Sequence, residues 1–184
     1  MEQLKLSDIR KPLNFRISKG LSCFNIEALA TNKYDVVLDF DVYLPTKKKN
    51  LQRDFCWDHT QKQQLIFSML KGINIPTISI IQYKDHISKG NSTIYKIIDG
   101  KQRLSTMIDF FSGHFPLIVN GREYFYGDLD EVAQRIIKLY EPLIDVVYEY
   151  WDDIISDDQK IAWFEMINFA GTPQDTEHLN NLKL

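Results

Sequence analysis

Alternation of apolar and polar residues is most regular over residues 36–44. Every second residue from Leu38 to Leu44 is apolar, which places these side chains on one side of an extended chain. The pattern predicts a half-buried β-strand. It stops at Pro45 and the Lys-Lys-Lys-Asn run at 47–50, because proline lacks an N–H group and adjacent cations repel one another. We expect an exposed loop there.

Two stretches instead carry apolar residues at intervals of three and four, which is the period of an amphipathic helix. The first spans residues 59–71, and Asp58 with Gln61 forms a capping box at its start. The second begins close to residue 102 and ends before Gly113. Its apolar positions are Leu104, Met107, Ile108 and Phe111.

Apolar runs bounded by turn residues predict further strands over 77–83, 93–98 and 143–150. Asn120-Gly121 between two apolar runs predicts a tight β-hairpin, because both residues tolerate a positive φ. Another helix is expected over 131–140.

A second capping box, formed by Ser156 and Gln159, opens a last helix that should end near Gly171. Strands and helices therefore alternate irregularly along the chain. This order predicts an α+β fold with a mixed sheet and flanking helices, not a doubly wound parallel sheet.

The N-terminal 34 residues show no sustained period, so we expect residues 1–34 to form an irregular arm with a short helix near 25–30. Residues 35–184 are expected to form one domain. The chain has 184 residues, of which 44% are apolar and 12% aromatic. This length and composition suit a single packed core and exclude wholesale disorder.

Charge and apolar content narrow the possible partners. Lys and Arg total 22 against 25 Asp and Glu, a net charge of −3, so any contact with DNA would have to be local. No apolar run approaches the roughly 20 residues of a membrane helix, and the N-terminus has no secretory signal. Cys23 and Cys56 form no C-x-x-C motif. We expect reduced thiols, a cytoplasmic location and no membrane partner.

The stretch that points to chemistry is residues 97–106, where a strand turns through Gly100 directly into an amphipathic helix. The free N–H groups of a helix start bind anions, and Lys101 and Arg103 add positive charge, so phosphate is the natural occupant. Asp99 could orient a water, hold Mg²⁺ or fix the arginine. On residue types alone, an ordinary helix start with surface charges accounts for the same residues.

The string at residues 99–103 resembles the Asp-Gly-Gln-Gln-Arg motif of a ParB/sulfiredoxin-like domain, with lysine in place of the first glutamine. That domain lies at the N-terminus of GmrSD modification-dependent restriction enzymes and of the defence protein SspE. Three more stretches resemble motifs of this family in the expected order: 50–57, 61–76 and 164–173.

The resemblance implies that the chain binds and hydrolyses a nucleoside triphosphate with Mg²⁺, in defence against foreign or modified DNA. It implies catalytic roles for Asp99, Gln102 and Arg103. The further nucleotide-binding residues are expected to be Gln52, Arg53, Trp57, Gly100, Lys101, Ser105, Thr106 and Asn168. The residues that would hold the metal stay open.

Some of these residues also have plain structural interpretations. Ser105 and Thr106 could serve only the helix, and Asn168 could be a C-terminal cap. Trp57 could stack on a base, whereas we expect Phe55 to pack in the core.

Two other functions stay open. The same pocket could sense a nucleotide without hydrolysing it and regulate a partner nuclease. A ParB-like DNA-binding module could instead use Arg53 and the lysines at 47–49 as contacts to DNA phosphates.

The cysteines and histidines, and a stretch near the C-terminus, do not predict further catalytic or metal sites. We expect Cys56 to be a small buried apolar side chain rather than a nucleophile. The four histidines lack zinc-ligand spacing. Glu177 to Asn181 superficially resembles an H-N-H nuclease motif, but only three residues follow it, so we expect no nuclease domain in this chain.

Overall fold

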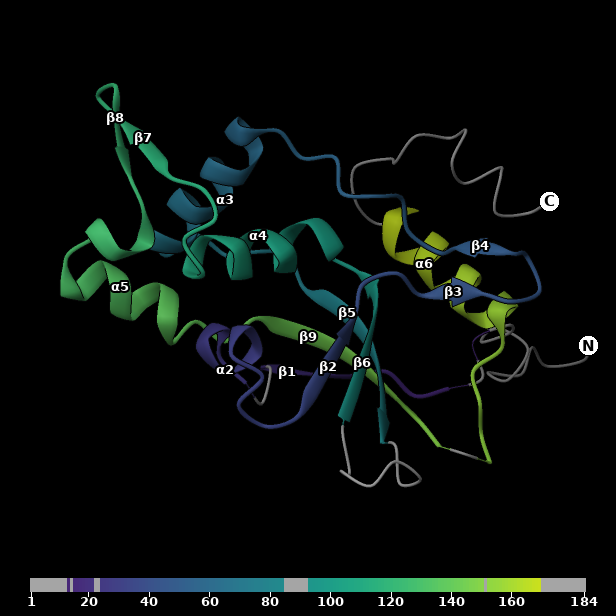
Figure 1. Cartoon of the computed structure of the whole chain (residues 1–184). Coiled ribbons are helices and arrows are strands. Elements are labelled where there is room, and N and C mark those ends of the chain that lie inside the picture. Colours follow the sequence, from purple (N-terminus) through teal and green to yellow (C-terminus); the bar gives the residue numbers. More distant parts are fainter. Residues whose placement is uncertain (1–12, 14, 22–23, 85–92, 151, 170–184) are drawn as a thin grey trace, which may run out of the picture.

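A five-stranded mixed sheet forms the centre of the computed structural model, which describes residues 13, 15–21, 24–84, 93–150 and 152–169 (Figure 1). The strand order is β1-β9-β5-β6-β2. Strand β6 pairs antiparallel with β5 and parallel with β2, while β9 pairs parallel with β5 and antiparallel with β1. The strands are β1 (Ser18–Leu21), β2 (Val36–Asp39), β5 (Ile78–Lys84), β6 (Thr93–Asp99) and β9 (Leu143–Glu149).

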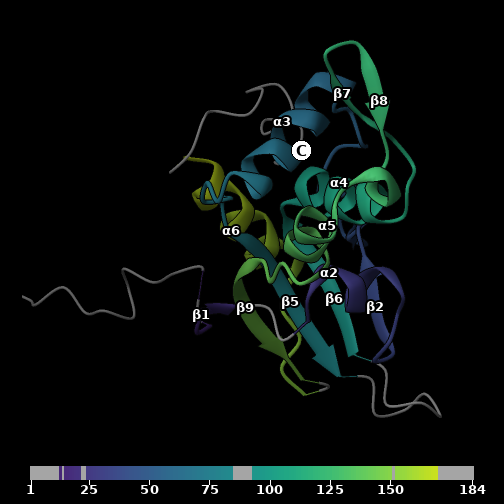
Figure 2. The same ribbon diagram turned by 90° about the vertical axis from the view of Figure 1, so that its left-hand side faces the viewer.

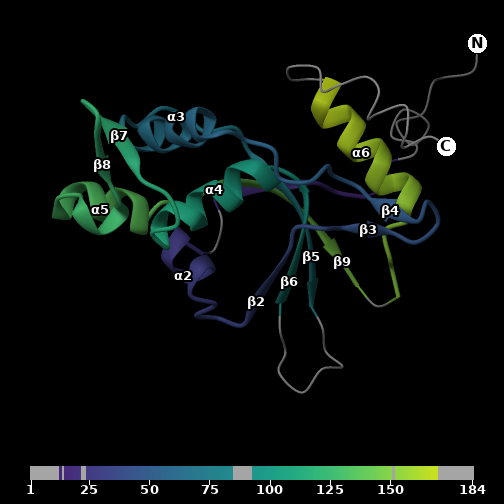
Figure 3. The same cartoon turned by 45° about the horizontal axis from the view of Figure 1, so that its top comes forward.

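Helices cover both faces of this sheet (Figures 2 and 3). One group comprises α2 (Ile26–Ala30), α3 (His59–Leu70), α4 (Lys101–Phe111) and α5 (Glu131–Lys138). On the other face lie α6 (Asp157–Phe169) and a small hairpin of β3 (Tyr43–Leu44) and β4 (Lys49–Asn50). This arrangement confirms the predicted α+β fold with flanking helices. None of the helices in the described ranges is long and apolar enough to cross a membrane.

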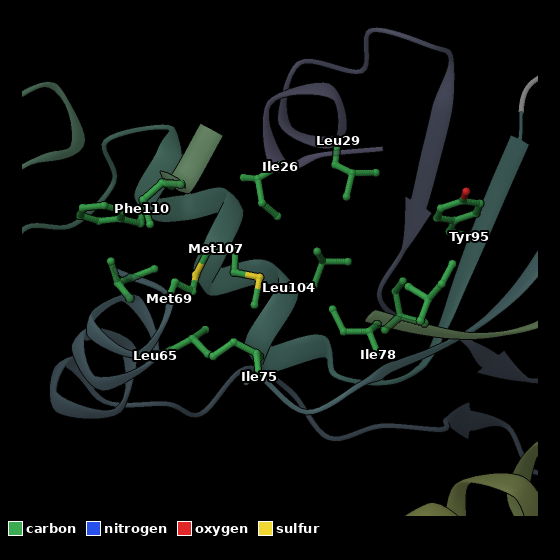
Figure 4. Packing of buried hydrophobic residues seen from close by; sticks show 14 of the residues in the cluster. Ile26, Leu29, Leu65, Met69, Ile75, Ile78, Tyr95, Leu104, Met107 and Phe110 are labelled. Carbon is green, nitrogen blue, oxygen red and sulfur yellow. The ribbon is translucent and has the colours of Figure 1, made fainter. Parts of the chain in front are cut away.

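The alternation of the central strands sorts their side chains into two cores. Ile80 and Ile97 pack toward the four-helix group, whereas their neighbours Ile81 and Ile98 pack toward α6. Helix α4 lies at the centre of the larger core, where its apolar side chains contact α2, α3 and the sheet (Figure 4). The residues that position the start of α4 are therefore held from several sides.

Most predicted element starts are confirmed. Asp58 accepts from the Gln61 N–H at 2.8 Å, and Gln61 Oε1 accepts from the Asp58 N–H at 3.0 Å. Ser156 and Gln159 form the second capping box. The Asn120-Gly121 turn joins β7 (Leu117–Val119) to β8 (Arg122–Tyr124), and a 3-10 turn, η1 (Tyr126–Asp128), follows.

The single strand predicted over residues 36–44 was wrong. Strand β2 ends at Asp39, whose carboxylate accepts from the Asp41 N–H at 3.1 Å and so stabilises a turn. The alternation continues, but Val42 and Leu44 pack in the second core rather than beside β2. The loop expected over residues 47–50 is also shorter than predicted, because Lys49–Asn50 pairs with β3.

The irregular arm expected over residues 1–34 was wrong for β1, whose backbone pairs with the edge of β9. An edge strand is paired on one side only and can form without an apolar alternation, which is why the pattern missed it. The short helix expected near residues 25–30 is confirmed as α2, capped by Asn25. Residues 1–12, 14 and 22–23 of the expected arm lie outside the described ranges.

One buried carboxylate joins α6 to the small hairpin. Burial alone would raise the pKa of Asp157, but hydrogen bonds from the Thr46 N–H (2.9 Å) and hydroxyl (2.7 Å) outweigh it. Lys160 adds a third contact at 3.3 Å. Together they hold the pKa of Asp157 below its ordinary value of 3.8.

We therefore predict a pH-dependent effect of Asp157→Asn. A carboxyl whose pKa falls on folding stabilises the folded state above its unfolded-state pKa, and this contribution is lost as pH falls through the folded value. The substitution should lower the free energy of unfolding by about 1–3 kcal/mol near neutral pH, and by progressively less below about pH 4. Denaturant titrations at several pH values measure this. Asp158→Asn is the control, because Asp158 is exposed in the same turn of the helix. A destabilisation by Asp157→Asn that does not change with pH would contradict the prediction.

Candidate functional site

A cavity of about 90 Å³ lies where the end of β6 turns into α4. A cavity of this size suits a small anionic group. The loop after β4 and helix α6 supply its other walls. Its lining residues are Gln52, Arg53, Trp57, Asp99, Gly100, Lys101, Gln102, Arg103 and Phe164.

Gly100 makes the turn from strand to helix possible. Its φ is +98°, a conformation that L side chains rarely adopt. An added Cβ would lie 3.0 Å from Ile78 Cγ1 and 3.3 Å from Arg103 Nη2. The backbone angle therefore favours glycine here, and the surrounding space is tight for a Cβ.

The start of α4 differs from those of the other α-helices in the described ranges. Side chains cap α2, α3, α5 and α6, whereas no side chain caps α4. The first N–H groups of a helix have no partner within the helix. At α4 the residues that carry these groups line the cavity, so the cavity lies at the positive end of the helix dipole.

Arg103 is fixed against the end of the sheet. Its Nη2 donates to Asp99 Oδ2 at 2.8 Å and to the Thr77 carbonyl at 3.0 Å. Arg103 Nε is buried and has no hydrogen-bond partner among the described residues. Of the three roles considered for Asp99, the structure shows that it fixes the arginine. Its second oxygen, Oδ1, has no partner within the described ranges.

Lys101 also has an acidic partner. Its ammonium group donates to Asp41 Oδ1 at 2.5 Å, and its side chain is only 8% exposed. Asp41 lies in the turn between β2 and β3. The lysine at the helix start is thus tied to a segment 60 residues earlier in the chain.

Gln102 holds the loop that forms the opposite wall. Its Oε1 accepts from the backbone N–H groups of Cys56 (2.9 Å) and Trp57 (3.2 Å), and its Nε2 donates to the Asp54 carbonyl at 3.1 Å. Three hydrogen bonds to the main chain fix this loop against α4. The amide predicted to act in catalysis is therefore engaged in positioning the wall that carries Trp57.

Gln52 and Arg53 close the cavity from the loop after β4. Gln52 Nε2 donates to the Ile97 carbonyl at 2.6 Å, which anchors the loop to β6. Arg53 is exposed, and its guanidinium forms no ion pair with any residue in the described ranges. Arg53 and Arg103, predicted to meet one ligand, line the same cavity.

Three predicted ligand-binding residues do not line this cavity: Ser105, Thr106 and Asn168. Thr106 is fully buried in α4, and its hydroxyl has no hydrogen-bond partner among the described residues. Asn168 Nδ2 donates to the Phe164 carbonyl at 2.7 Å within α6. The sequence missed Phe164, which lines the cavity. Only its place in the last family-like stretch could have indicated it.

The rest of the loop corrects two expectations. Cys56 is an exposed free thiol, so the expectation of a buried side chain was wrong. Phe55 is half-buried and lies outside both cores. The Lys62 ammonium instead lies over its ring at 4.6 Å and over the Phe115 ring at 5.3 Å. These contacts tie the loop to α3.

Metal-binding residues are sparse. The described residues contain no group of three or more His, Cys, Asp or Glu that could hold a metal ion. His59 bonds to Gln63, and His114 to Asp109. His86 and His178 lie outside the described ranges. Among the cavity-lining residues, Asp99 is the one carboxylate.

Comparison with known protein families shows which family the chain matches. The model of the GmrSD restriction endonuclease, N-terminal domain, matches residues 40–183. No curated protein and no solved structure matches. The matched range contains all nine residues that line the cavity. The chain therefore belongs to the family of GmrSD restriction endonuclease N-terminal domains.

Proposed function

We propose that this domain binds a nucleoside triphosphate at the start of α4 and hydrolyses it, in the service of defence against foreign or modified DNA. The supporting observation is that the uncapped start of α4, Arg53 and Arg103 line one cavity. Backbone donors and guanidinium groups are the donors that phosphates prefer in proteins. The family of the chain supports the link to restriction of DNA. The protein would meet both the nucleoside triphosphate and the DNA in the cytoplasm, so we place it there.

The phosphates would occupy the cavity, and the nucleoside would lie outside it. A cavity of about 90 Å³ suits a phosphoryl group better than a complete nucleotide. Arg53 has no competing carboxylate in the described ranges and can turn its planar fork toward phosphate oxygens. Trp57 offers a ring on which a base of any kind can stack. This arrangement predicts strong recognition of phosphate and weak selection of the base.

The residues of the cavity fit a magnesium ion that arrives with the nucleotide. Mg²⁺ usually keeps several waters and binds through one or two carboxylates together with substrate phosphates. Asp99 Oδ1 is the carboxylate oxygen that could hold it. The ion would supply neutralisation of charge on the phosphate oxygens.

Hydrolysis would depend mainly on positioning. Arg103 would neutralise charge that develops on the transferred phosphoryl group, while Asp99 keeps its guanidinium in place. Gln102 would act through the loop that it holds, so we reassign it from a catalytic to a positioning residue. Lys101 and Gly100 would shape the helix start.

A second candidate is a nucleotide sensor that does not hydrolyse its ligand and regulates a partner nuclease. The observation in its favour is that Asp99 already bonds to Arg103, which leaves one carboxylate oxygen for both metal and water. Binding without turnover would then transmit the signal.

Phosphate release from the four nucleoside triphosphates with Mg²⁺ distinguishes these functions. Wild type should release phosphate, and Arg103→Ala should reduce the rate by at least about 100-fold, because removal of an arginine from a phosphoryl-transfer site costs orders of magnitude. Arg103→Lys, which keeps the charge without the planar fork, should recover only part of the rate. Thermal unfolding checks that each variant folds. Equal release by wild type and Arg103→Ala would contradict hydrolysis at this site, and saturable binding without release would select the sensor.

A further inference from the structure

Lys101 is a buried cation whose only hydrogen-bond partner in the described ranges is exposed. The lysine side chain is 8% exposed, whereas that of Asp41 is 64% exposed. A buried ammonium group is unfavourable unless it is paired, so the position of Lys101 depends on Asp41. Asp41 itself does not line the cavity.

The turn that presents Asp41 is held separately from the cavity. Asp39 accepts from the Asp41 N–H at 3.1 Å, and Asp39 is the last residue of β2. The Asp41 carboxylate can therefore be changed without substituting any residue that lines the cavity. The ion pair of Asp41 and Lys101 can therefore be tested by substituting Asp41.

We infer that Asp41 acts as an electrostatic latch: it keeps the Lys101 ammonium paired, so that this charge is not available to a ligand in the phosphate-binding cavity, and it thereby limits the affinity of the domain for polyphosphates. The inference rests on the proposed function, because it concerns the same cavity. Each cavity-lining cation differs in its pairing: Arg53 is unpaired within the described ranges, Arg103 pairs with Asp99, and Lys101 pairs with Asp41.

Two physical effects follow from the loss of the Asp41 carboxylate. The local charge becomes more positive by one unit, which strengthens attraction of any anion. The ammonium group also becomes free to move, since lysine carries it on a flexible four-carbon stem. The first effect would follow from removing any nearby carboxylate, but the second requires Lys101. A double-mutant cycle separates them.

The experiment is calorimetric titration of the full chain with inorganic triphosphate, which avoids any dependence on the base. We expect Asp41→Asn to tighten binding by about threefold to tenfold, and Asp41→Glu, which keeps the carboxylate, to bind like wild type. Asp54→Asn is the matched control. Asp54 is exposed on the loop that forms the cavity wall, and its carboxylate makes no ion pair with a described residue. Its removal should change the affinity by less than about twofold.

The decisive comparison is made in a Lys101→Gln background. There Asp41→Asn should have no larger effect than Asp54→Asn. The latch is overturned if the two aspartate substitutions are equivalent in wild type, if the gain persists without Lys101, or if Asp41→Asn weakens binding. These results leave the proposed function intact as long as wild type binds triphosphate. Absence of binding in wild type and in every variant overturns both.

Discussion

Gly100→Ala is expected to destabilise the protein by about 2–4 kcal/mol and to abolish nucleotide binding, because a left-handed backbone and a steric overlap act at the same residue. The added methyl group would meet Ile78 Cγ1 at 3.0 Å and Ile78 Cγ2 at 3.2 Å. Ile78 is buried at the start of β5, where its core neighbours limit how far it can shift. The expected relief is a rotation of the turn, which would withdraw the N–H groups of α4 from the cavity.

Two other glycines provide controls for this substitution. Gly72 and Gly113 have φ values of +69° and +76°, but nothing lies within 4 Å of an added Cβ at either residue. Alanine there should cause only the backbone cost of about 1–2 kcal/mol. Denaturant titration of the three variants, with triphosphate binding measured in parallel, gives the comparison. If Gly100→Ala lowered the free energy of unfolding no more than the two control substitutions, the close contact between the turn and Ile78 would not contribute to stability.

Arg53→Ala, in contrast to Gly100→Ala, should leave the stability unchanged while it causes a large loss of affinity for triphosphate. The side chain is exposed and makes no ion pair in the described ranges, so the free energy of unfolding should change by less than about 0.5 kcal/mol. A charge-assisted hydrogen bond to phosphate contributes about 1.5–3 kcal/mol, which predicts a loss of roughly 10-fold to 100-fold in affinity.

Arg122→Ala is the control for the loss of a positive charge, since Arg122 is exposed on β8 and does not line the cavity. Calorimetry on both variants measures the difference. Equal affinity of Arg53→Ala and wild type would show that the loop wall does not touch the ligand.

Local patterns predicted the parts of this fold that short-range physics controls. The capping boxes at Asp58 and Ser156 and the Asn120-Gly121 turn depend on residues within a few positions of one another. Strand β1 depends instead on a partner strand more than 120 residues away, and the break after Asp39 depends on a side-chain hydrogen bond that competes with the sheet. Neither interaction produces a periodic pattern of apolar residues in the sequence.

The same distinction applies to the site. The strand-turn-helix around Gly100 could be predicted from residue types, and the resemblance added the loop at residues 50–57. The partners of the side chains could not be predicted. Gln102 bonds to loop backbone 45 to 48 residues away, and Lys101 pairs with Asp41 across 60 residues. These contacts follow from tertiary packing, which joins segments far apart in the sequence.

We expect the uncapped start of α4 and Arg53 to bind the two sides of one polyphosphate. A crystal structure of the protein with Mg²⁺ and a non-hydrolysable nucleoside triphosphate tests it most directly. Density for the terminal phosphate should lie within hydrogen-bond distance of the first N–H groups of α4, with the Arg53 guanidinium turned onto it. Phosphates bound elsewhere, or an Arg53 side chain directed away from a nucleotide-filled cavity, would contradict it.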